Sequence, residues 1–366
     1  MTSLPSTSHE LLPLLLQSIN TTFTSLRSPS TLPPSTADDS SPSTIEIRSD
    51  FLTLLSILSK QSTNLTLALK PPPDEKATYA TLDKMRDAVE KLKFLMDLLK
   101  GRKGELDKRL RWALIESLES LSSFLTLSTS YLPPKPTSTS PAQRQQLLSS
   151  CKTLWKVSEK IERDLPASEL DAVRKSWRDV VGLLEDCEKE IKEMVEQSGE
   201  SDGFEDDEEE EEEEEVEKEE LSENTKEIIL NSHTLLRLSR LLINRLITLT
   251  NSTTPTNPTP LPKKFESAEY LMGLTMSIKR ISEKADDLAG VLEDVEDEKE
   301  AVKNVVDEIV KIGEKISREI QEAYEEGEEE GSTEEERGKS KKQGEWFGVW
   351  RGQRDKAHES ILTALR

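Results

Sequence analysis

The sequence predicts an all-α protein with two packed helical bundles, about five helices in the first, joined by a disordered acidic linker. The first reason is that leucine-type side chains recur every three or four positions over most of the chain, which is the period of an amphipathic helix. The second is that only 4% of the residues are aromatic and 14 are glycine, which does not suit many short strands. The third is a nearly equal share of hydrophobic (34%) and charged (33%) residues, which long helices tolerate because each buries one stripe.

Segments that cannot bury a core interrupt this helical pattern. They are rich in proline and serine or in acidic residues, a composition typical of linkers. We therefore expect two folded regions with linkers between and around them. The predicted regions are an N-terminal helix with a Ser/Thr/Pro-rich linker (1–43), an N-terminal helical bundle (44–197), an acidic disordered linker (198–221), a C-terminal long-helix bundle (222–324), and a charged linker with a Trp-containing tail helix (325–366).

The N-terminal half reads as one short helix followed by five longer ones. The short helix is expected over 9–27, where Pro13 restricts its start. Five amphipathic stripes joined by short loops then predict an up-and-down bundle. Ser168, with Asp171 three residues later, predicts an N-terminal cap on the last of these helices. The stripes run over 51–69, 82–99, 106–125, 147–165 and 170–194.

The C-terminal bundle begins with a helix over about 225–250, whose Leu and Ile residues cover a wide surface and predict contacts on several sides. The next pattern, 271–323, alternates spacings of three and four, and only Lys299 and Gly313 in the series are not apolar. A register kept over this length predicts a coiled-coil-like seam, formed by one long helix or by two in phase. If the seam is broken, we expect the break in the acidic stretch Asp294–Glu300.

The tryptophans give two kinds of expectation. Trp155 and Trp177 lie on helical faces that predict burial, so both are interpreted as core anchors. Trp346 and Trp350 stand beside glycines in the polar tail, before an apolar helical stripe that ends at Leu365. This pattern predicts that the tail is a docking segment. The bundle of the same chain and a partner protein are equal candidates for the surface on which it docks.

The formal charge of −23 comes partly from residues 205–215, which are all acidic. Like charges at this density favour an extended segment. An acidic protein repels a phosphate backbone, so direct binding to nucleic acid is disfavoured and basic protein partners fit better. The run is interpreted either as a solvated spacer or as a site that captures basic segments. It begins with the acidic tract Glu205, Asp206, Asp207 and Glu208.

The sequence contains no recognisable enzyme motif. His9, His233 and His358 are far apart, and neither a phosphate-binding glycine loop nor a zinc-binding pattern occurs. Cys151 and Cys187 lie on apolar stripes, which predicts buried, inert thiols. We therefore predict no catalytic residue, no metal site, no cofactor and no small-molecule ligand. No apolar segment reaches the roughly 20 residues that span a bilayer, so no membrane partner is expected.

Five segments resemble the cyclin-D-binding, GCIP-type family, in the same order along the chain. They are FLTLLSILSKQSTNLTLALKPPP (51–73), SSCKTLWKVSEKIERDLP (149–166), AVRKSWRDVVGLLEDCEKEIKEMVE (172–196), ILNSHTLLRLSRLLINRLI (229–247) and LMGLTMSIKRISEKADDLAGVLED (271–294). The chain looks like a divergent, fungal-like member, because its Ser/Thr/Pro-rich linker and Trp-rich tail depart from the family pattern. The resemblance implies two bundles without catalysis, partners among D-type cyclins and helix-loop-helix factors, and a location in the nucleus and cytoplasm.

The leading hypothesis is an adaptor or inhibitor that controls cell-cycle progression or transcription through helix–helix contacts. Its binding surface is expected on the 225–250 helix, the 271–323 seam and the tail, and the assignment fails if the seam is buried within the chain. The alternatives are an acidic chaperone for basic proteins such as histones, a vinculin- or catenin-like cytoskeletal adaptor, and a di-metal bundle enzyme. The candidate partner-binding residues are Leu235, Leu238, Leu242, Leu274, Ile278, Ile281, Trp346 and Trp350.

Overall fold

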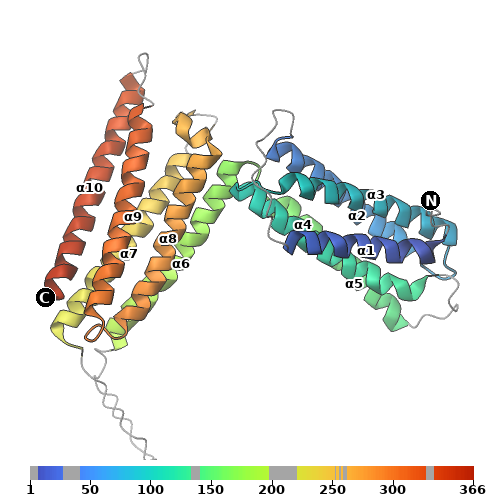
Figure 1. The fold of residues 1–366 in the computed structure, drawn as a ribbon, viewed down its shortest axis with the longest axis horizontal. Helices are drawn as coiled ribbons and strands as arrows, with labels where there is room; N and C mark the ends of the chain where they lie inside the picture. Colours follow the sequence, from blue (N-terminus) through green and yellow to red (C-terminus); the bar gives the residue numbers. More distant parts are fainter. Residues whose placement is uncertain are drawn as a thin grey trace, which may run out of the picture. The chain divides into compact units, whose positions relative to one another are not determined.

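The structure is a computed structural model, and it describes residues 7–27, 42–132, 141–197, 221–251, 253–254, 257–258, 262–326 and 334–366. These residues contain ten α-helices, two short 3-10 helices and one antiparallel pair of two-residue strands, Thr253–Thr254 (β1) and Asn257–Pro258 (β2). The predicted all-α class is therefore confirmed. Contacts divide the chain into two compact units, Met1–Ala172 and Val173–Arg366, and each is a helical bundle (Figure 1). The acidic tract Glu205–Glu208 lies outside the described residues.

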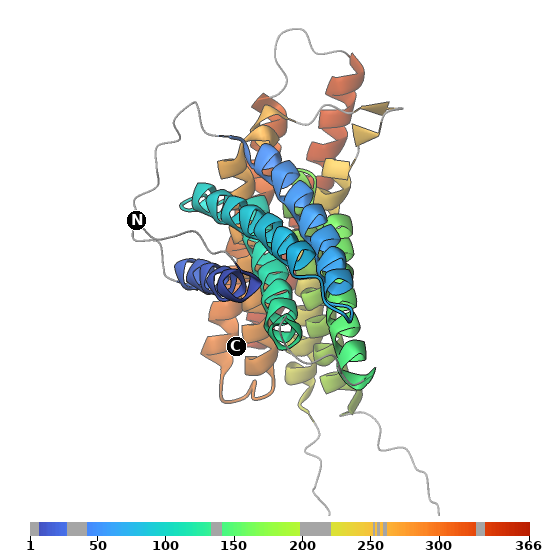
Figure 2. The same cartoon turned by 90° about the vertical axis from the view of Figure 1, so that its right-hand side faces the viewer.

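The described part of the first unit contains five helices that run side by side (Figures 1 and 2). They are α1 (Ser8–Arg27), α2 (Thr44–Ala68), α3 (Glu75–Leu99), α4 (Glu105–Ser128) and α5 (Pro141–Asp164), with the 3-10 turn η1 (Thr129–Tyr131) after α4. α2 packs against α3 and α5, and α4 packs against α5. α1 packs against both α3 and α4, so it completes the bundle.

Short sequence signals set the helix ends in this unit. At the start of α2, Ser43 Oγ accepts a hydrogen bond from Glu46 N (3.2 Å), and Ser43 N donates to the Glu46 carboxylate (2.7 Å). Ser43 Oγ also donates to this carboxylate (2.9 Å), and the two bonds that the carboxylate accepts from Ser43 lower the pKa of Glu46. Asp74 Oδ1 accepts from Ala77 N (3.0 Å) and caps α3. Gly101 ends α3 with a φ of 79°, a conformation that glycine adopts without strain.

α1 belongs to the core of the first unit and is more than an N-terminal extension. Two polar contacts fix it on α3: Ser8 N and Oγ donate to the Glu75 carboxylate (2.9 and 2.8 Å), and Ser18 Oγ donates to Glu90 (2.7 Å). Its apolar face is completely buried, through Leu11, Leu12, Leu15 and Ile19.

The described part of the second unit also contains five helices, all but one of them wholly within it. They are α6 (Glu169–Gln197), which begins just before the division, α7 (Glu223–Asn251), α8 (Ala268–Leu292), α9 (Lys299–Glu326) and α10 (Glu334–Ala364), with the 3-10 turn η2 (Lys263–Glu266) before α8. α8 packs against α9, and α10 packs against both α7 and α9. α6 contacts α8 through Trp177, whose Nε1 donates to Thr275 Oγ1 (3.1 Å).

The division of the chain at Ala172 differs from the predicted bundle boundary at 197. The difference concerns α6, which the sequence analysis grouped with the first bundle. Its apolar face is buried in the second unit, where Arg240 of α7 pairs with Glu185 and Glu188 of α6 (both 2.8 Å). The predicted cap of α6 is confirmed, because Ser168 Oγ accepts from Asp171 N (3.1 Å).

The pattern over 271–323 forms two helices and not one. The turn between them, Glu293–Glu298, overlaps the acidic stretch in which a break was expected. α8 and α9 lie against each other, and the apolar positions of the pattern are buried. Lys299 begins α9 and is exposed. Gly313 is buried, and a Cβ atom on it would lie 3.0 Å from a ring carbon of Trp350.

Candidate protein-binding groove

The predicted partner-binding surface of the second unit is covered in the fold. α8 packs against α9, and α10 packs against α7, so the seam is buried within the chain and offers no free surface to a partner helix. This is the condition under which that assignment fails. Five of the predicted residues are at most 1% exposed: Leu235, Leu242, Leu274, Ile278 and Ile281.

The other three predicted residues lie where the tail meets α7. Trp350 is 4% exposed, and its Nε1 donates to the backbone oxygen of the half-buried Leu238 (2.8 Å). Trp346 is half-buried, and the guanidinium of Arg245 lies 5.4 Å from the centre of its ring. The tail therefore docks on its own bundle.

The first unit carries an open groove of about 350 Å³ between α2 and α5. The two helices are antiparallel, because Arg48 near the start of α2 donates from Nη2 to the backbone oxygen of Leu165, just after α5 (3.0 Å). Small hydroxyl side chains allow the helices to approach each other. Ser59 Oγ of α2 donates to Ser158 Oγ of α5 (3.0 Å).

Trp155 of α5 is the largest side chain that lines this groove. It is 41% exposed, and its Nε1 donates to the backbone oxygen of Ser59 (3.2 Å), so the indole is held against α2 with its hydrogen-bond donor already satisfied. Leu52 of α2 lines the groove as a second apolar side chain. Lys60 and Glu162 line it as well, and within the described residues neither forms an ion pair or hydrogen bond. The groove thus combines apolar surface with two unpaired charges of opposite sign.

The interpretation of Trp155 as a core anchor was wrong, whereas that of Trp177 is confirmed by its complete burial. The position of Trp155 relative to the buried stripe of α5 indicates that its side chain is partly exposed. The buried positions of α5 follow spacings of four and three residues, and Trp155 comes one position after the buried Leu154. A side chain next to the stripe lies at the edge of the buried face, where a groove between two helices opens.

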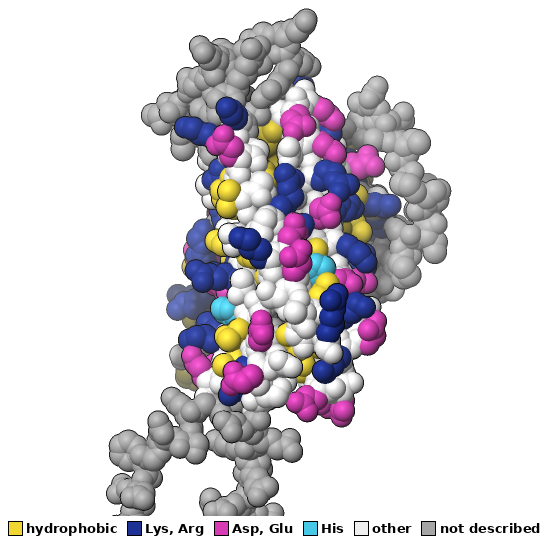
Figure 3. All heavy atoms as spheres, turned by 90° about the vertical axis from the view of Figure 1, so that its left-hand side faces the viewer, with side chains coloured by type: hydrophobic (Ala, Val, Ile, Leu, Met, Phe, Trp, Pro, Cys, Tyr) yellow, Lys and Arg dark blue, Asp and Glu magenta, His cyan; other side chains and the backbone are white. Residues whose placement is uncertain are grey.

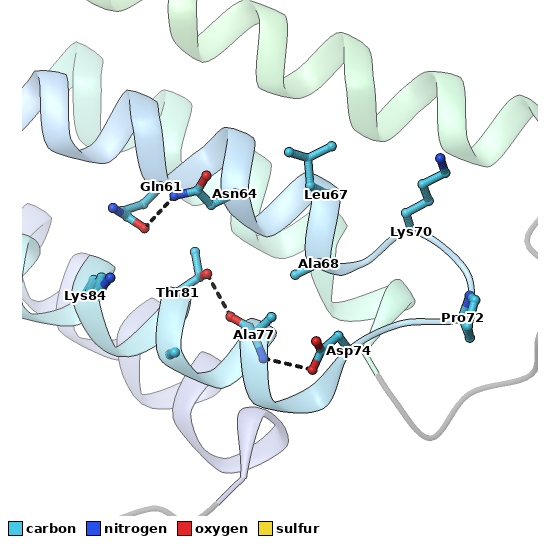
Figure 4. Close-up of a pocket in the computed structure, with 11 residues that line it drawn as sticks. Gln61, Asn64, Leu67, Ala68, Lys70, Pro72, Asp74, Ala77, Thr81 and Lys84 are labelled. Atoms are coloured by element: carbon cyan, nitrogen blue, oxygen red, sulfur yellow. Dashed lines mark hydrogen bonds between the residues drawn. The ribbon is translucent and has the colours of Figure 1, made fainter.

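A second hollow of about 490 Å³ lies at the turn between α2 and α3 (Figure 4). Its polar groups bind one another. Gln61 Oε1 accepts from Asn64 Nδ2 (3.2 Å), and Thr81 Oγ1 donates to Ala77 O (2.8 Å). Lys70 and Lys84 lie well apart in the close-up, so no set of groups converges on one ligand atom. The α2–α5 groove is therefore the better candidate.

Among the described residues, the two cysteines do not form a reactive site, and the possible metal ligands do not form a metal-binding cluster. Cys151 and Cys187 are both buried, as predicted, and burial raises the pKa of the Cys187 thiol. His358 contacts Asp307 (2.7 Å), but the described ranges hold no group of three or more His, Cys, Asp and Glu residues able to bind a metal ion. Within the same ranges, no helix has both the length and the apolar content to cross a membrane.

The two units differ in charge. Met1–Ala172 contains 21 Lys and Arg residues against 20 Asp and Glu residues, so its formal charge is close to zero. The acidic excess of the chain therefore follows Ala172. Binding in the α2–α5 groove would depend on short-range contacts, because the first unit has no net charge to attract a partner over distance.

Two protein-family models match this chain, and together they cover residues of both units. Residues 50–197 match the family described as Grap2 and cyclin-D-interacting, N-terminal, and residues 168–324 match a domain of unknown function. The matches overlap over α6, and both α1 and α10 lie outside them. No curated protein matches the chain. The match confirms the resemblance noted in the sequence: residues 50–197 are similar to the N-terminal domain of the Grap2 and cyclin-D-interacting family.

Proposed function

We propose that this protein is a non-enzymatic regulator of cell-cycle progression and transcription that binds a D-type cyclin through the α2–α5 groove. Trp155 carries the proposal. It is a large, half-exposed aromatic side chain in a groove of the matched domain, and its N–H is already bonded. Tryptophans at the centre of interfaces contribute a large part of the binding free energy.

The groove favours a partner segment with one central apolar side chain. That side chain would cover Trp155 and Leu52, which removes apolar surface from water on both proteins. A basic residue of the partner would pair with Glu162, and an acidic residue with Lys60. An amphipathic helix supplies this combination, because charged residues flank its apolar stripe.

Calorimetric titration of the full chain with a purified D-type cyclin tests the proposal. Trp155→Ala should weaken binding by about 30-fold, the equivalent of the roughly 2 kcal/mol that a central aromatic contributes. Trp112→Ala is the matched control, because Trp112 is 71% exposed on α4 and does not line the groove. Equal affinities for both variants would rule out the groove, and no binding by the unmodified chain would rule out the cyclin.

Helix-loop-helix factors are the second partner class that we propose for the same groove, since they also present amphipathic helices. The same titration with such a factor distinguishes a wrong partner from a wrong site. We further propose that the protein is present in nucleus and cytoplasm, where both partner classes would be accessible. Imaging of a tagged chain tests this location, and retention in one compartment only would contradict it.

A further inference from the structure

α10 belongs to the second unit but lies outside the range of that unit that matches a known domain. The match to the domain of unknown function ends at residue 324, within α9, whereas α10 begins at Glu334. The matched range covers α6, α7 and α8 and all but the last two residues of α9. α10 packs between two of them, α7 and α9. Figure 3 views the molecule from the left of Figure 1, where α10 lies, and shows Lys, Arg, Asp and Glu side chains interspersed with small apolar areas.

α10 docks through one buried stripe, as a helix does when it lies in a groove. The stripe alternates spacings of three and four residues, the pattern of a helix that contacts its neighbours along one seam. Val349 lies outside the stripe and is 67% exposed. The buried residues of the stripe are Phe347, Trp350, Arg354, Ala357, Ile361 and Ala364.

The groove contains a slot for an aromatic side chain. Gly313 of α9 forms one wall, because its missing side chain leaves the space that the Trp350 ring fills. The backbone oxygen of Leu238 on α7 forms the other, and it accepts the indole N–H of Trp350 (2.8 Å). Neither feature depends on the rest of α10. A tryptophan on any helix that lies in this groove would find the same slot and the same acceptor.

α10 fills the groove imperfectly at the next stripe position. Arg354 is 5% exposed, and its Nη1 atom is buried without a hydrogen-bond partner. Its other donors reach Asp355, its neighbour in the chain, and its guanidinium lies 5.3 Å from the centre of the Trp350 ring. A buried charge with an unpaired donor opposes docking, and an apolar side chain of similar volume removes that penalty.

The described part of α10 also makes polar contacts beside the stripe, among them a hydrogen bond from Arg351 Nη2 to Gln321 Oε1 of α9 (3.0 Å). Gln343 accepts two hydrogen bonds from Arg245 of α7 (3.1 and 2.6 Å), and His358 contacts Asp307 of α9 (2.7 Å). Such contacts at the protein surface exchange readily with water. They specify where α10 lies, but they add little to the strength with which it is held.

We propose that the groove between α7 and α9 is a helix-binding site, which α10 occupies within the same chain and from which a partner helix displaces it. The partner is a protein segment that forms an amphipathic helix, with a tryptophan above Gly313 and an apolar residue in place of Arg354. Because this groove lies in the second unit, the proposal is independent of the α2–α5 groove, and either can fail alone.

The test uses the full-length chain and a fluorescent peptide of residues 341–366 that carries Arg354→Leu. Trp350→Ala in the chain empties the slot and should tighten peptide binding at least about 10-fold relative to the unmodified chain. Arg354→Leu in the chain strengthens the internal contact and should weaken peptide binding below that of the unmodified chain. Val349→Ala is the matched control and should change nothing. Equal affinity for all four chains, or failure of the peptide to bind Trp350→Ala, would overturn the proposal.

Hydrogen exchange supplies a readout that does not depend on any variant's ability to fold. In the unmodified chain, saturating peptide should remove the protection of the α10 amides while α7 and α9 stay protected. A peptide that also carries Trp350→Ala should bind at least about 10-fold more weakly, the loss typical of a central aromatic. Peptide bound at saturation with α10 still protected would show that it binds elsewhere, and the proposal would fail.

Discussion

α1 and α10 occupy equivalent places at opposite ends of the chain and are held by different means. Each lies outside the matched ranges and packs against two helices of its own unit, α1 against α3 and α4, and α10 against α7 and α9. α1 buries an apolar face that consists of leucine and isoleucine. α10 buries a stripe interrupted by Arg354.

From this difference we predict that α1 is a structural helix and that α10 is an exchangeable one. Burial of a Leu or Ile side chain contributes about 1.5–3 kcal/mol, so the face of α1 holds that helix as firmly as any part of the core. α10 also buries large apolar side chains, Phe347, Trp350 and Ile361, but its stripe includes Arg354, whose buried Nη1 has no hydrogen-bond partner and therefore opposes docking. We therefore expect α1 to be needed for the stability of its bundle and α10 to be a removable cover on the second bundle.

The largest expected effect is the loss of stability when a buried side chain of α1 is truncated. Leu15 is completely buried, so Leu15→Ala should lower the free energy of unfolding of the first unit by about 3 kcal/mol, the middle of the range for buried leucines. Leu14 is the control on the same helix. It is 49% exposed, and Leu14→Ala should change stability by less than about 0.5 kcal/mol. Denaturant unfolding followed by circular dichroism measures both, and similar losses from both variants would mean that α1 is not a core helix.

A substitution opposite α10 should release that helix and leave the bundle folded. Gly313→Leu places a side chain in the space of the Trp350 ring, which should weaken docking by about 1–3 kcal/mol. α9 itself should not suffer, because leucine favours a helix over glycine by roughly 1 kcal/mol.

Gly290 of α8 is the matched control for this substitution, since a Cβ atom there meets nothing within 4 Å. Hydrogen exchange should show loss of protection in α10 for Gly313→Leu and none for Gly290→Leu. Simultaneous loss in α7, α8 and α9 would show instead that α10 is as integral as α1.

The periodicity of apolar residues in the sequence predicts only part of this comparison between α1 and α10. A stripe shows that a face is buried but not which helix buries it, so α6 was assigned to the bundle before it although its face packs in the second unit. The same limit explains the predicted binding surface. Leu235 and Leu242 read as spare apolar surface but are buried, and α10, which packs against their helix α7, follows much later in the chain.

Single residues that break a pattern carried more information than the pattern. Gly313 was an exception in the 271–323 series, and its reason is a tryptophan of α10. Trp155 lies one position beside its stripe, and it marks the candidate groove. Both became interpretable only in three dimensions, because the partner that explains each lies on another helix.

Glu169 gives the first unit a pH-dependent contact. Its carboxylate accepts hydrogen bonds from the backbone N–H groups of Glu105 (2.6 Å) and Leu106 (3.0 Å) at the start of α4. Burial is the largest influence on the pKa of Glu169 and raises it, the nearby carboxylates of Asp107 and Glu105 raise it further, and the two hydrogen bonds offset these effects only in part.

The folded state therefore binds a proton on Glu169 more readily than the unfolded chain does. Stability relative to Glu169→Gln should rise as pH falls from neutral through the raised pKa, and should level off below the unfolded value of 4.5. Unfolding of both chains at several pH values measures this difference. A difference that is constant with pH, or one that rises with pH, contradicts the raised pKa.

The smallest expected effect concerns the charge contrast between the units. Deletion of residues 205–215 removes eleven acidic residues that follow the nearly neutral first unit. If binding occurs through apolar contact in the α2–α5 groove, the affinity for a D-type cyclin should stay within about twofold, because such contact does not depend on the charge of the deleted run. An acidic chaperone predicts the opposite, a loss of binding to histones with the deletion. High salt weakens long-range charge attraction but not short-range apolar contact. Titrations at low and high salt therefore show whether binding depends on the groove of the first unit or on the acidic residues that follow that unit.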